Sequence, residues 1–245
     1  MSNEFVEIMD IPFLRTNKKD FVKQVFENYV QKERKCFIVT ANPEMIMIAK
    51  ANEAFSALLE QADFVIPDGI GVVIASKILK KPLENRVPGI EVMEEFLQLG
   101  NENKLKVFLL GAKETVVAKA AKMVQVRYPH VNIVGYHHGF FDSQDTAIAS
   151  KISQYHPDFV FVALGSPKQE QWIQDHLPVF TKGIFMGVGG SFDVIAGEMK
   201  RAPILWQKLN LEWLYRLIQE PSRWRRLLVL PKFMLKINKY RKGNS

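Results

Sequence analysis

The chain has 245 residues, of which 47% are hydrophobic and 24% are charged, proportions that are ordinary for a globular protein. No apolar run reaches the roughly 18 residues of a membrane span, and a single cysteine, Cys36, excludes an internal disulfide. The N-terminal residues Met1 to Glu4 show no basic region followed by an apolar one. We therefore expect a protein of the reducing cytoplasm without a signal peptide.

The net charge of +7 is unevenly distributed along the chain. From Met199 onward there are 12 Lys and Arg against 2 Asp and Glu, whereas the rest of the chain carries 21 against 24. Three of the four tryptophans also lie in this C-terminal part. We predict two units, an α/β core over residues 1–200 and a basic amphipathic helical appendage over residues 201–245. The separate composition of the appendage suggests that it has its own binding partner.

The predicted elements alternate between helix and strand. In chain order, apolar spacing and apolar runs predict helix 18–33, strand 36–39, helix 44–59, strand 64–66, helix 72–79, and a helix that carries Val92, Met93, Phe96 and Leu97. The order continues with strand 106–110, helix 114–127, strand 131–134, a further helix, strand 158–164 and strand 184–186. This alternation predicts an α/β fold, a Rossmann-like parallel sheet with helices on both faces.

Polar residues gather where the predicted strands end. Thr40 and Asn42 follow one strand, Asp68 a second, Ser166 to Glu170 a third, and Gly187 to Asp193 a fourth. Because the carboxyl ends of parallel strands share one edge, where open α/β sheets hold ligands, we expect these side chains to converge. Asp68 itself has two interpretations at this point, a catalytic carboxylate or the N-cap of the helix that follows.

Two of these turns have the composition of anion sites. Gly165-Ser166-Pro167 is typical of a turn, an N-cap and a first helical residue, and the free N–H groups of such a helix start suit a diphosphate. An ordinary capped helix has the same pattern. At Gly187-Val188-Gly189-Gly190 the backbone could approach a phosphate or sugar, but the third glycine of the dinucleotide fingerprint is missing, which disfavours a nicotinamide site.

Metal ligands are not grouped in the sequence. No Asp-x-Asp pair occurs, and His137-His138 has no partner at ligand spacing. We therefore predict no metal site and interpret the histidine pair as part of a solvent-exposed loop.

Five blocks together resemble the WecG/TagA/CpsF glycosyltransferases, glycosyltransferase family 26, over nearly the whole chain. The blocks are Thr40-Ala41-Asn42-Pro43, Pro67-Asp68-Gly69, Arg86-Val87-Pro88-Gly89, Gly165 to Glu170, and Gly187 to Asp193. Within the family the chain is most similar to the TagA/TarA branch of wall teichoic acid synthesis. The resemblance implies that N-acetylmannosamine passes from its UDP donor to N-acetylglucosaminyl-diphospho-undecaprenol. The linkage would be β-1,4, formed with inversion, and the reaction would need neither a metal nor a cofactor, since the UDP-sugar is a substrate.

The resemblance also implies roles for individual residues. Asp68 would be the general base that takes the proton of the acceptor hydroxyl, with Thr40, Asn42, Arg86 and Gln169 as further catalytic candidates. Without a metal, arginines and helix N-termini would neutralise the charge that develops on the leaving UDP. The substrate-binding candidates are Ser166, Lys168, Gly187, Gly189, Gly190, Asp193, Arg216, Arg223 and Arg226.

The C-terminal part mixes basic residues with Trp and Leu. A single helical stripe is predicted to carry Leu205, Trp206, Leu209, Trp213 and Leu217. Together with the basic residues that follow, it predicts a helix on an anionic bilayer, so we expect the enzyme to be peripheral on the cytoplasmic face of the cell membrane. A helix packed on the core with a solvated basic end is the alternative.

Other interpretations stay open at this stage. UDP-N-acetylmannosaminuronic acid is the main rival donor within the family. A nucleic-acid-binding protein could use the same basic tail, but it would leave the strand-end cluster unexplained, and we expect no nucleic-acid partner. A nucleotide-dependent oxidoreductase could use the same fold, and a homo-oligomer is a candidate assembly.

Overall fold

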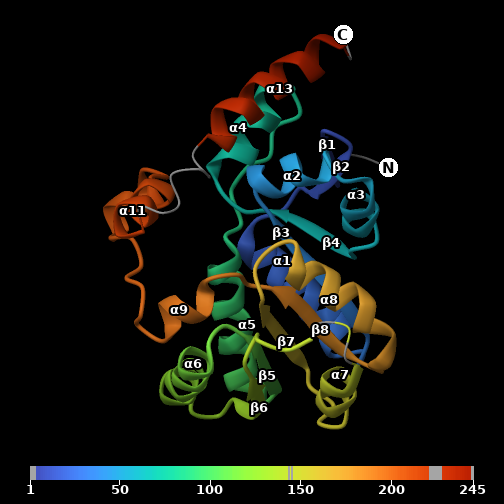
Figure 1. Ribbon diagram of the computed structural model, residues 1–245, viewed down its shortest axis with the longest axis vertical. Coiled ribbons are helices and arrows are strands. Elements are labelled where there is room, and N and C mark those ends of the chain that lie inside the picture. Colours follow the sequence, from blue (N-terminus) through green and yellow to red (C-terminus); the bar gives the residue numbers. More distant parts are fainter. Residues whose placement is uncertain (1–3, 143, 145, 221–227, 244–245) are drawn as a thin grey trace.

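The computed structural model describes residues 4–142, 144, 146–220 and 228–243, and for Lys208 and Arg216 only the backbone. Six strands form one sheet in the order β4-β3-β8-β7-β5-β6, and every neighbouring pair is parallel (Figure 1). These strands are β3 (Lys35–Ala41), β4 (Phe64–Pro67), β5 (Lys106–Gly111), β6 (Asn132–His137), β7 (Phe159–Ala163) and β8 (Gly183–Gly187). The α/β prediction is confirmed.

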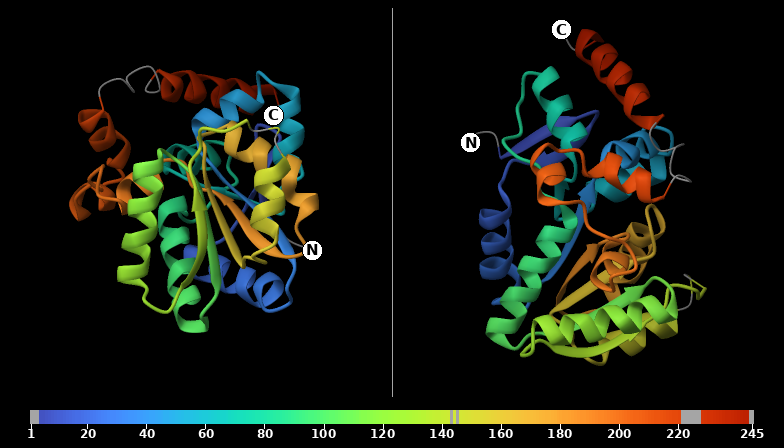
Figure 2. Two further views of the ribbon diagram at one scale, coloured as in Figure 1. Left: turned by 60° about the horizontal axis from the view of Figure 1, so that its bottom comes forward. Right: turned by 90° about the vertical axis from the view of Figure 1, so that its left-hand side faces the viewer.

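Helices cover both faces of this sheet, and Figure 2 shows the sheet between the two layers. One face packs against α1 (Lys18–Val25), α5 (Gly89–Asn103), α6 (Glu114–Arg127) and α9 (Ser191–Ile195). The other face packs against α2 (Pro43–Ala49), α3 (Glu53–Glu60), α7 (Thr146–Ser153) and α8 (Lys168–His176). The inner strands β3, β7 and β8 are buried on both sides, which is why they are continuous apolar runs in the sequence.

Two features near the N-terminal half differ from the sequence prediction. A hairpin of β1 (Phe5–Ile8) and β2 (Ile11–Leu14) was not predicted, because its turn residues Met9 and Asp10 adopt positive φ without the Asn-Gly or Asp-Gly signal. The predicted helix 44–59 is two helices, since the Asn52 side chain accepts the Phe55 N–H at 3.1 Å and begins α3. Helix α1 continues as a π-helix, η1 (Phe26–Val30), and η2 (Leu177–Val179) follows α8.

The C-terminal part consists of α10 (Ile204–Lys208), α11 (Glu212–Gln219) and α13 (Val229–Gly243), with α4 (Ile70–Ile78) beside the last of these. The predicted single stripe from Leu205 to Leu217 is wrong, because Asn210 takes a left-handed conformation between α10 and α11. Helix α13 packs on α2 and α4 with Phe233 and Ile237 fully buried, as in the alternative of a helix packed on the core. No described helix is long and apolar enough to cross a membrane. The unit boundary at residue 200 stays a prediction.

Candidate active site

A cleft of about 1260 Å³ opens at the carboxyl edge of the sheet. Its lining brings together most of the predicted site residues from four strand ends. They are Thr40, Asn42, Asp68, Arg86, Ser166, Lys168, Gln169, Gly189, Gly190 and Asp193. Gly187 is the last residue of β8, directly before this lining. The expected convergence is therefore observed, while the chemical role of each residue stays a prediction.

Asp68 follows β4 and faces the cleft. Its backbone N–H donates to the Ala41 carbonyl oxygen at 2.9 Å, which fixes it beside the end of β3. Gly69, with a φ of 98°, occupies the N-cap position of α4. Asp68 lies one residue before it, so the interpretation of Asp68 as the N-cap residue is wrong.

The side chains of Thr40 and Asn42 form hydrogen bonds from the end of β3 to β8 and to α2. The Thr40 hydroxyl donates to the Gly187 carbonyl oxygen at 3.3 Å across the sheet. Asn42 is the N-cap of α2, where its side-chain oxygen accepts the Met45 N–H at 3.1 Å. Both side chains line the cleft while they hold its wall in place.

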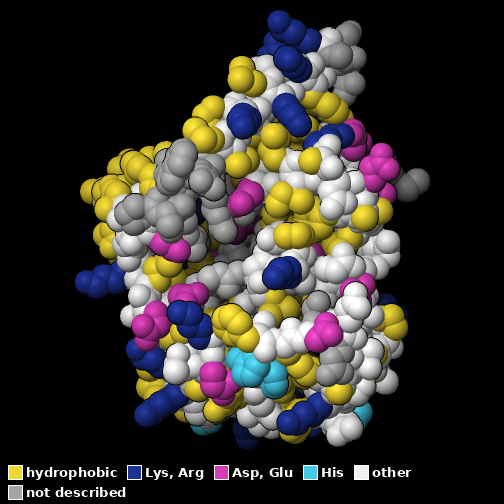
Figure 3. All heavy atoms as spheres, in the orientation of Figure 1, with side chains coloured by type: hydrophobic (Ala, Val, Ile, Leu, Met, Phe, Trp, Pro, Cys, Tyr) yellow, Lys and Arg dark blue, Asp and Glu magenta, His cyan; other side chains and the backbone are white. Residues whose placement is uncertain are grey.

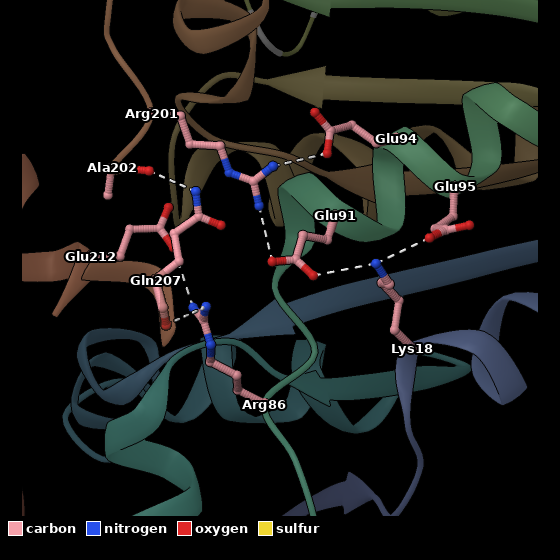
Figure 4. A network of polar contacts seen from close by, with 9 residues as sticks. All are labelled: Lys18, Arg86, Glu91, Glu94, Glu95, Arg201, Ala202, Gln207 and Glu212. Carbon is pink, nitrogen blue, oxygen red and sulfur yellow. Dashed lines mark hydrogen bonds and ion pairs between the residues drawn. The ribbon is translucent and has the colours of Figure 1, made fainter. Parts of the chain in front are cut away.

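Arg86 contacts the C-terminal part of the chain. Its Nη1 donates to Glu212 Oε2 at 3.2 Å and its Nη2 to the Gln207 carbonyl oxygen at 3.3 Å (Figure 4). A second contact lies close by, in which Arg201 bridges Glu91 and Glu94 of α5. The sequence suggested Arg86 as a catalytic candidate but gave no indication of its pairing with Glu212, which also lines the cleft.

Gln169 and Glu170 form a buried pair at the start of α8. Gln169 Nε2 donates to Glu170 Oε1 at 2.7 Å, and Gln169 Oε1 accepts the Gly189 N–H at 3.1 Å. Burial raises the pKa of the Glu170 carboxyl, while its interactions with the Gln169 and Ser166 side chains act in the opposite direction. The sequence placed Glu170 in a motif but could not show that its carboxyl is buried.

The start of α8 differs from the predicted capping pattern. Pro167 occupies the N-cap position, with no side-chain cap, and the Gln169 N–H donates to the Gly165 carbonyl oxygen at 3.0 Å. The prediction that Ser166 is the N-cap and Pro167 the first helical residue is wrong, because this turn shifts the helix start to Lys168. Ser166 and Lys168 are both exposed at the cleft.

The remaining candidates lie beyond what the structure describes. Arg216 belongs to α11, but its side chain is not described, and Arg223 and Arg226 lie outside the described residues. The lining also includes residues that were not predicted, among them Lys113 before α6 and the exposed Phe140 in the loop after β6. His137 ends β6 and is only partly exposed, rather than lying in a solvated loop. Among the described residues, no group of three or more His, Cys, Asp or Glu could hold a metal ion.

Comparison with known proteins gives a consistent result. The sequence profile of the Glycosyl transferase WecG/TagA/CpsF family matches residues 6–245. Proteins of Staphylococcus aureus strains MW2 and NCTC 8325 are 44% identical over 237 residues, 96% of this chain and 92% of their own length. A protein of strain MRSA252 is 43% identical over the same span. All three are named N-acetylglucosaminyldiphosphoundecaprenol N-acetyl-beta-D-mannosaminyltransferase.

Proposed function

Because the chain belongs to the WecG/TagA/CpsF family of glycosyltransferases, we propose that it transfers N-acetylmannosamine from UDP-N-acetylmannosamine to undecaprenyl-diphospho-N-acetylglucosamine. The names of relatives that are 44% identical over 96% of the chain support this sugar and this acceptor. The sugar is added to the 4-hydroxyl of N-acetylglucosamine in a β-1,4 linkage, as a step of wall teichoic acid synthesis. A cleft of about 1260 Å³ exceeds the usual size of a single small-ligand pocket, which suits a donor and an acceptor headgroup together.

Asp68 is the proposed general base. Its position directly after β4, where it lines the cleft, is the observation that supports this role. In the transfer, Asp68 takes the proton of the acceptor 4-hydroxyl while that oxygen attacks the anomeric carbon of the donor. The bond from this carbon to the UDP oxygen breaks, and UDP leaves with the electron pair. A single displacement of this kind inverts the configuration at the anomeric carbon.

The charge of the departing UDP is neutralised by the protein in this proposal, without a metal or a cofactor. The turn at Gly190 and the start of α8 border the cleft with backbone N–H groups, and arginines supply the positive charge. Arg86 is the cleft-lining arginine in the described part of the chain, with Arg216, Arg223 and Arg226 as candidates from the C-terminal part. Thr40 and Asn42 would contact the acceptor, and Gln169, Ser166, Lys168 and Asp193 the donor or acceptor sugar.

We further propose that the C-terminal part rests on the cytoplasmic face of the membrane. Apolar side chains gather on the surface of α10 and α11, where Ile204, Leu205 and Leu209 are 71%, 65% and 59% exposed (Figure 3). Lysines and arginines gather on α13, namely Lys232, Lys236, Lys239, Arg241 and Lys242. Exposed apolar groups next to basic ones suit an anionic bilayer, which is also where a polyprenyl acceptor lies.

A donor panel tests the proposed function. The purified protein is incubated with UDP-N-acetylmannosamine, UDP-N-acetylmannosaminuronic acid or UDP-N-acetylglucosamine, together with a short-chain lipid-diphospho-N-acetylglucosamine. We expect a disaccharide product with the first donor and little with the others. Preferential use of the uronic acid donor would favour the rival reaction, and the absence of any transfer would contradict the proposal.

A further inference from the structure

Glu170 is a buried carboxyl group to which the proposed reaction gives no task. Its side chain is 1% exposed, and no hydrogen bond of ordinary geometry reaches its Oε2 from the described residues. Burying such an oxygen costs free energy, which an apolar side chain of similar size would not cost. Besides its interaction with the Ser166 side chain, the carboxyl group accepts a hydrogen bond from Gln169 Nε2 at 2.7 Å. The position therefore carries a cost to stability, and its contact with Gln169 leads toward the cleft.

The contact with Glu170 determines how the Gln169 amide is oriented. An amide has a donor end and an acceptor end, and its hydrogen-bond partners decide which way it faces. The Glu170 carboxylate accepts the NH₂ group at 2.7 Å, so the amide oxygen faces the opposite way. That oxygen accepts the Gly189 N–H at 3.1 Å. A reversed amide would direct its NH₂ group at this N–H, and the bond to the loop would be lost.

Close packing leaves the pair little freedom. A Cβ atom on Gly187 would lie 2.5 Å from Gln169 Nε2 and 3.0 Å from Glu170 Oε1, so both side chains pack directly on the backbone at the end of β8. The carbonyl oxygen of the same Gly187 accepts the Thr40 hydroxyl at 3.3 Å. The Glu170 carboxyl is thus connected, through Gln169, to the glycine-rich turn that forms one wall of the cleft.

We propose that Glu170 is a positioning residue for the transfer reaction. It fixes the orientation of the Gln169 amide, and through that amide it fixes the backbone of Gly189 at the wall of the cleft. Its effect on catalysis rests on the proposed function, whereas its effect on the Gly189 N–H does not. A misplaced wall of this kind lowers the rate even though the residue itself touches no substrate.

Glu170→Leu separates this role from a role in stability. Leucine keeps the volume but cannot accept a hydrogen bond, so we expect a kcat about 10- to 100-fold lower with a smaller change in the donor KM. The melting temperature should be unchanged or higher, because the unsatisfied buried oxygen is gone. Glu170→Gln retains a carbonyl acceptor and should restore part of the lost kcat. Glu102→Gln is the matched control, since Glu102 accepts from Gln98 in the same way on the exposed surface of α5.

A double-mutant cycle shows whether Glu170 acts through Gln169. In a Gln169→Ala background, Glu170→Leu should cost little more, because the amide that it orients is absent. Equal losses in both backgrounds, or a wild-type kcat in the single Glu170→Leu variant, would overturn the inference. A loss of kcat that is matched by a lower melting temperature in both Glu170 variants would assign the residue a purely structural role.

Exchange of the Gly189 amide proton gives a readout that does not depend on activity. We expect it to be protected in the wild-type protein and to exchange about 10-fold faster in Glu170→Leu, with Glu102→Gln unchanged. If the wild-type protein transfers no sugar but this exchange difference is observed, the proposed function fails and the positioning contact stands. Equal exchange in the wild type and in Glu170→Leu contradicts the contact itself.

Discussion

The Arg86 guanidinium and the Glu212 carboxylate form an ion pair, with 3.2 Å between Nη1 and Oε2, although the two residues are 126 positions apart in the chain. Their side chains are only 18% and 11% exposed. Arg86 precedes α5 in the core, and Glu212 begins α11. The pair therefore attaches the C-terminal helices at the rim of the cleft, next to the carbonyl contact with Gln207.

Glu212→Gln should loosen that attachment. The exchange keeps the size of the side chain and removes its charge, which leaves a largely buried guanidinium without its carboxylate, at a cost of about 1 kcal/mol. We expect faster hydrogen exchange in α10 and α11 than in the wild-type protein. Glu27→Gln, which alters an exposed pair with Lys23, serves as the control and should leave exchange unchanged. Identical exchange rates in Glu212→Gln and wild type would mean that the pair does not hold these helices.

The membrane proposal needs point substitutions, because removing the C-terminal part would also remove Phe233 and Ile237 from the core. Lys232→Gln, Lys236→Gln and Lys239→Gln change exposed positions of α13. Each should weaken binding to anionic vesicles by about 1 kcal/mol, and added salt should weaken it further. Sedimentation with phosphatidylglycerol vesicles measures this, with the exposed Lys122→Gln on α6 as the control. Equal losses at Lys122 and at α13 would show that total charge alone is responsible.

The raised pKa of the Glu170 carboxyl predicts that the stability of the protein depends on pH. Burial raises the pKa of its carboxyl in the folded protein, so the folded state binds more protons than the unfolded state above about pH 4.3, the ordinary glutamate value. The contribution of this carboxyl to the free energy of unfolding therefore falls as the pH rises above about 4.3. Glu170→Leu removes the effect, and its advantage in melting temperature over the wild type should be larger at neutral pH than at pH 4. An advantage that does not change with pH would contradict the raised pKa.

Much of the fold follows from local sequence signals, because strands buried on both faces must be apolar throughout. The runs at β3, β5 and β7 were found for this reason. The turn at Met9 and Asp10 was missed because its residues lack the usual signal. The carboxyl ends of the strands predicted where the site residues converge. The pairing of Arg86 with Glu212 and the burial of Glu170 depend on contacts between distant segments, which no local pattern encodes.

Transfer should proceed in the presence of excess EDTA. The reason is the absence of an Asp-x-Asp pair, together with arginines and backbone N–H groups that take up the charge of the leaving diphosphate. Product formation is measured with and without EDTA and after addition of Mg²⁺ or Mn²⁺. A large loss with EDTA that either metal restores would contradict metal-independent transfer.

Asp68→Asn tests the central claim most directly. Asparagine keeps the size of the side chain but cannot accept the proton of the acceptor hydroxyl. With UDP-N-acetylmannosamine and the short-chain acceptor, we expect kcat to fall by about 10²- to 10⁴-fold, while UDP binding and the melting temperature stay close to those of the wild type. A kcat near the wild-type value in Asp68→Asn would contradict the assignment of Asp68 as the general base.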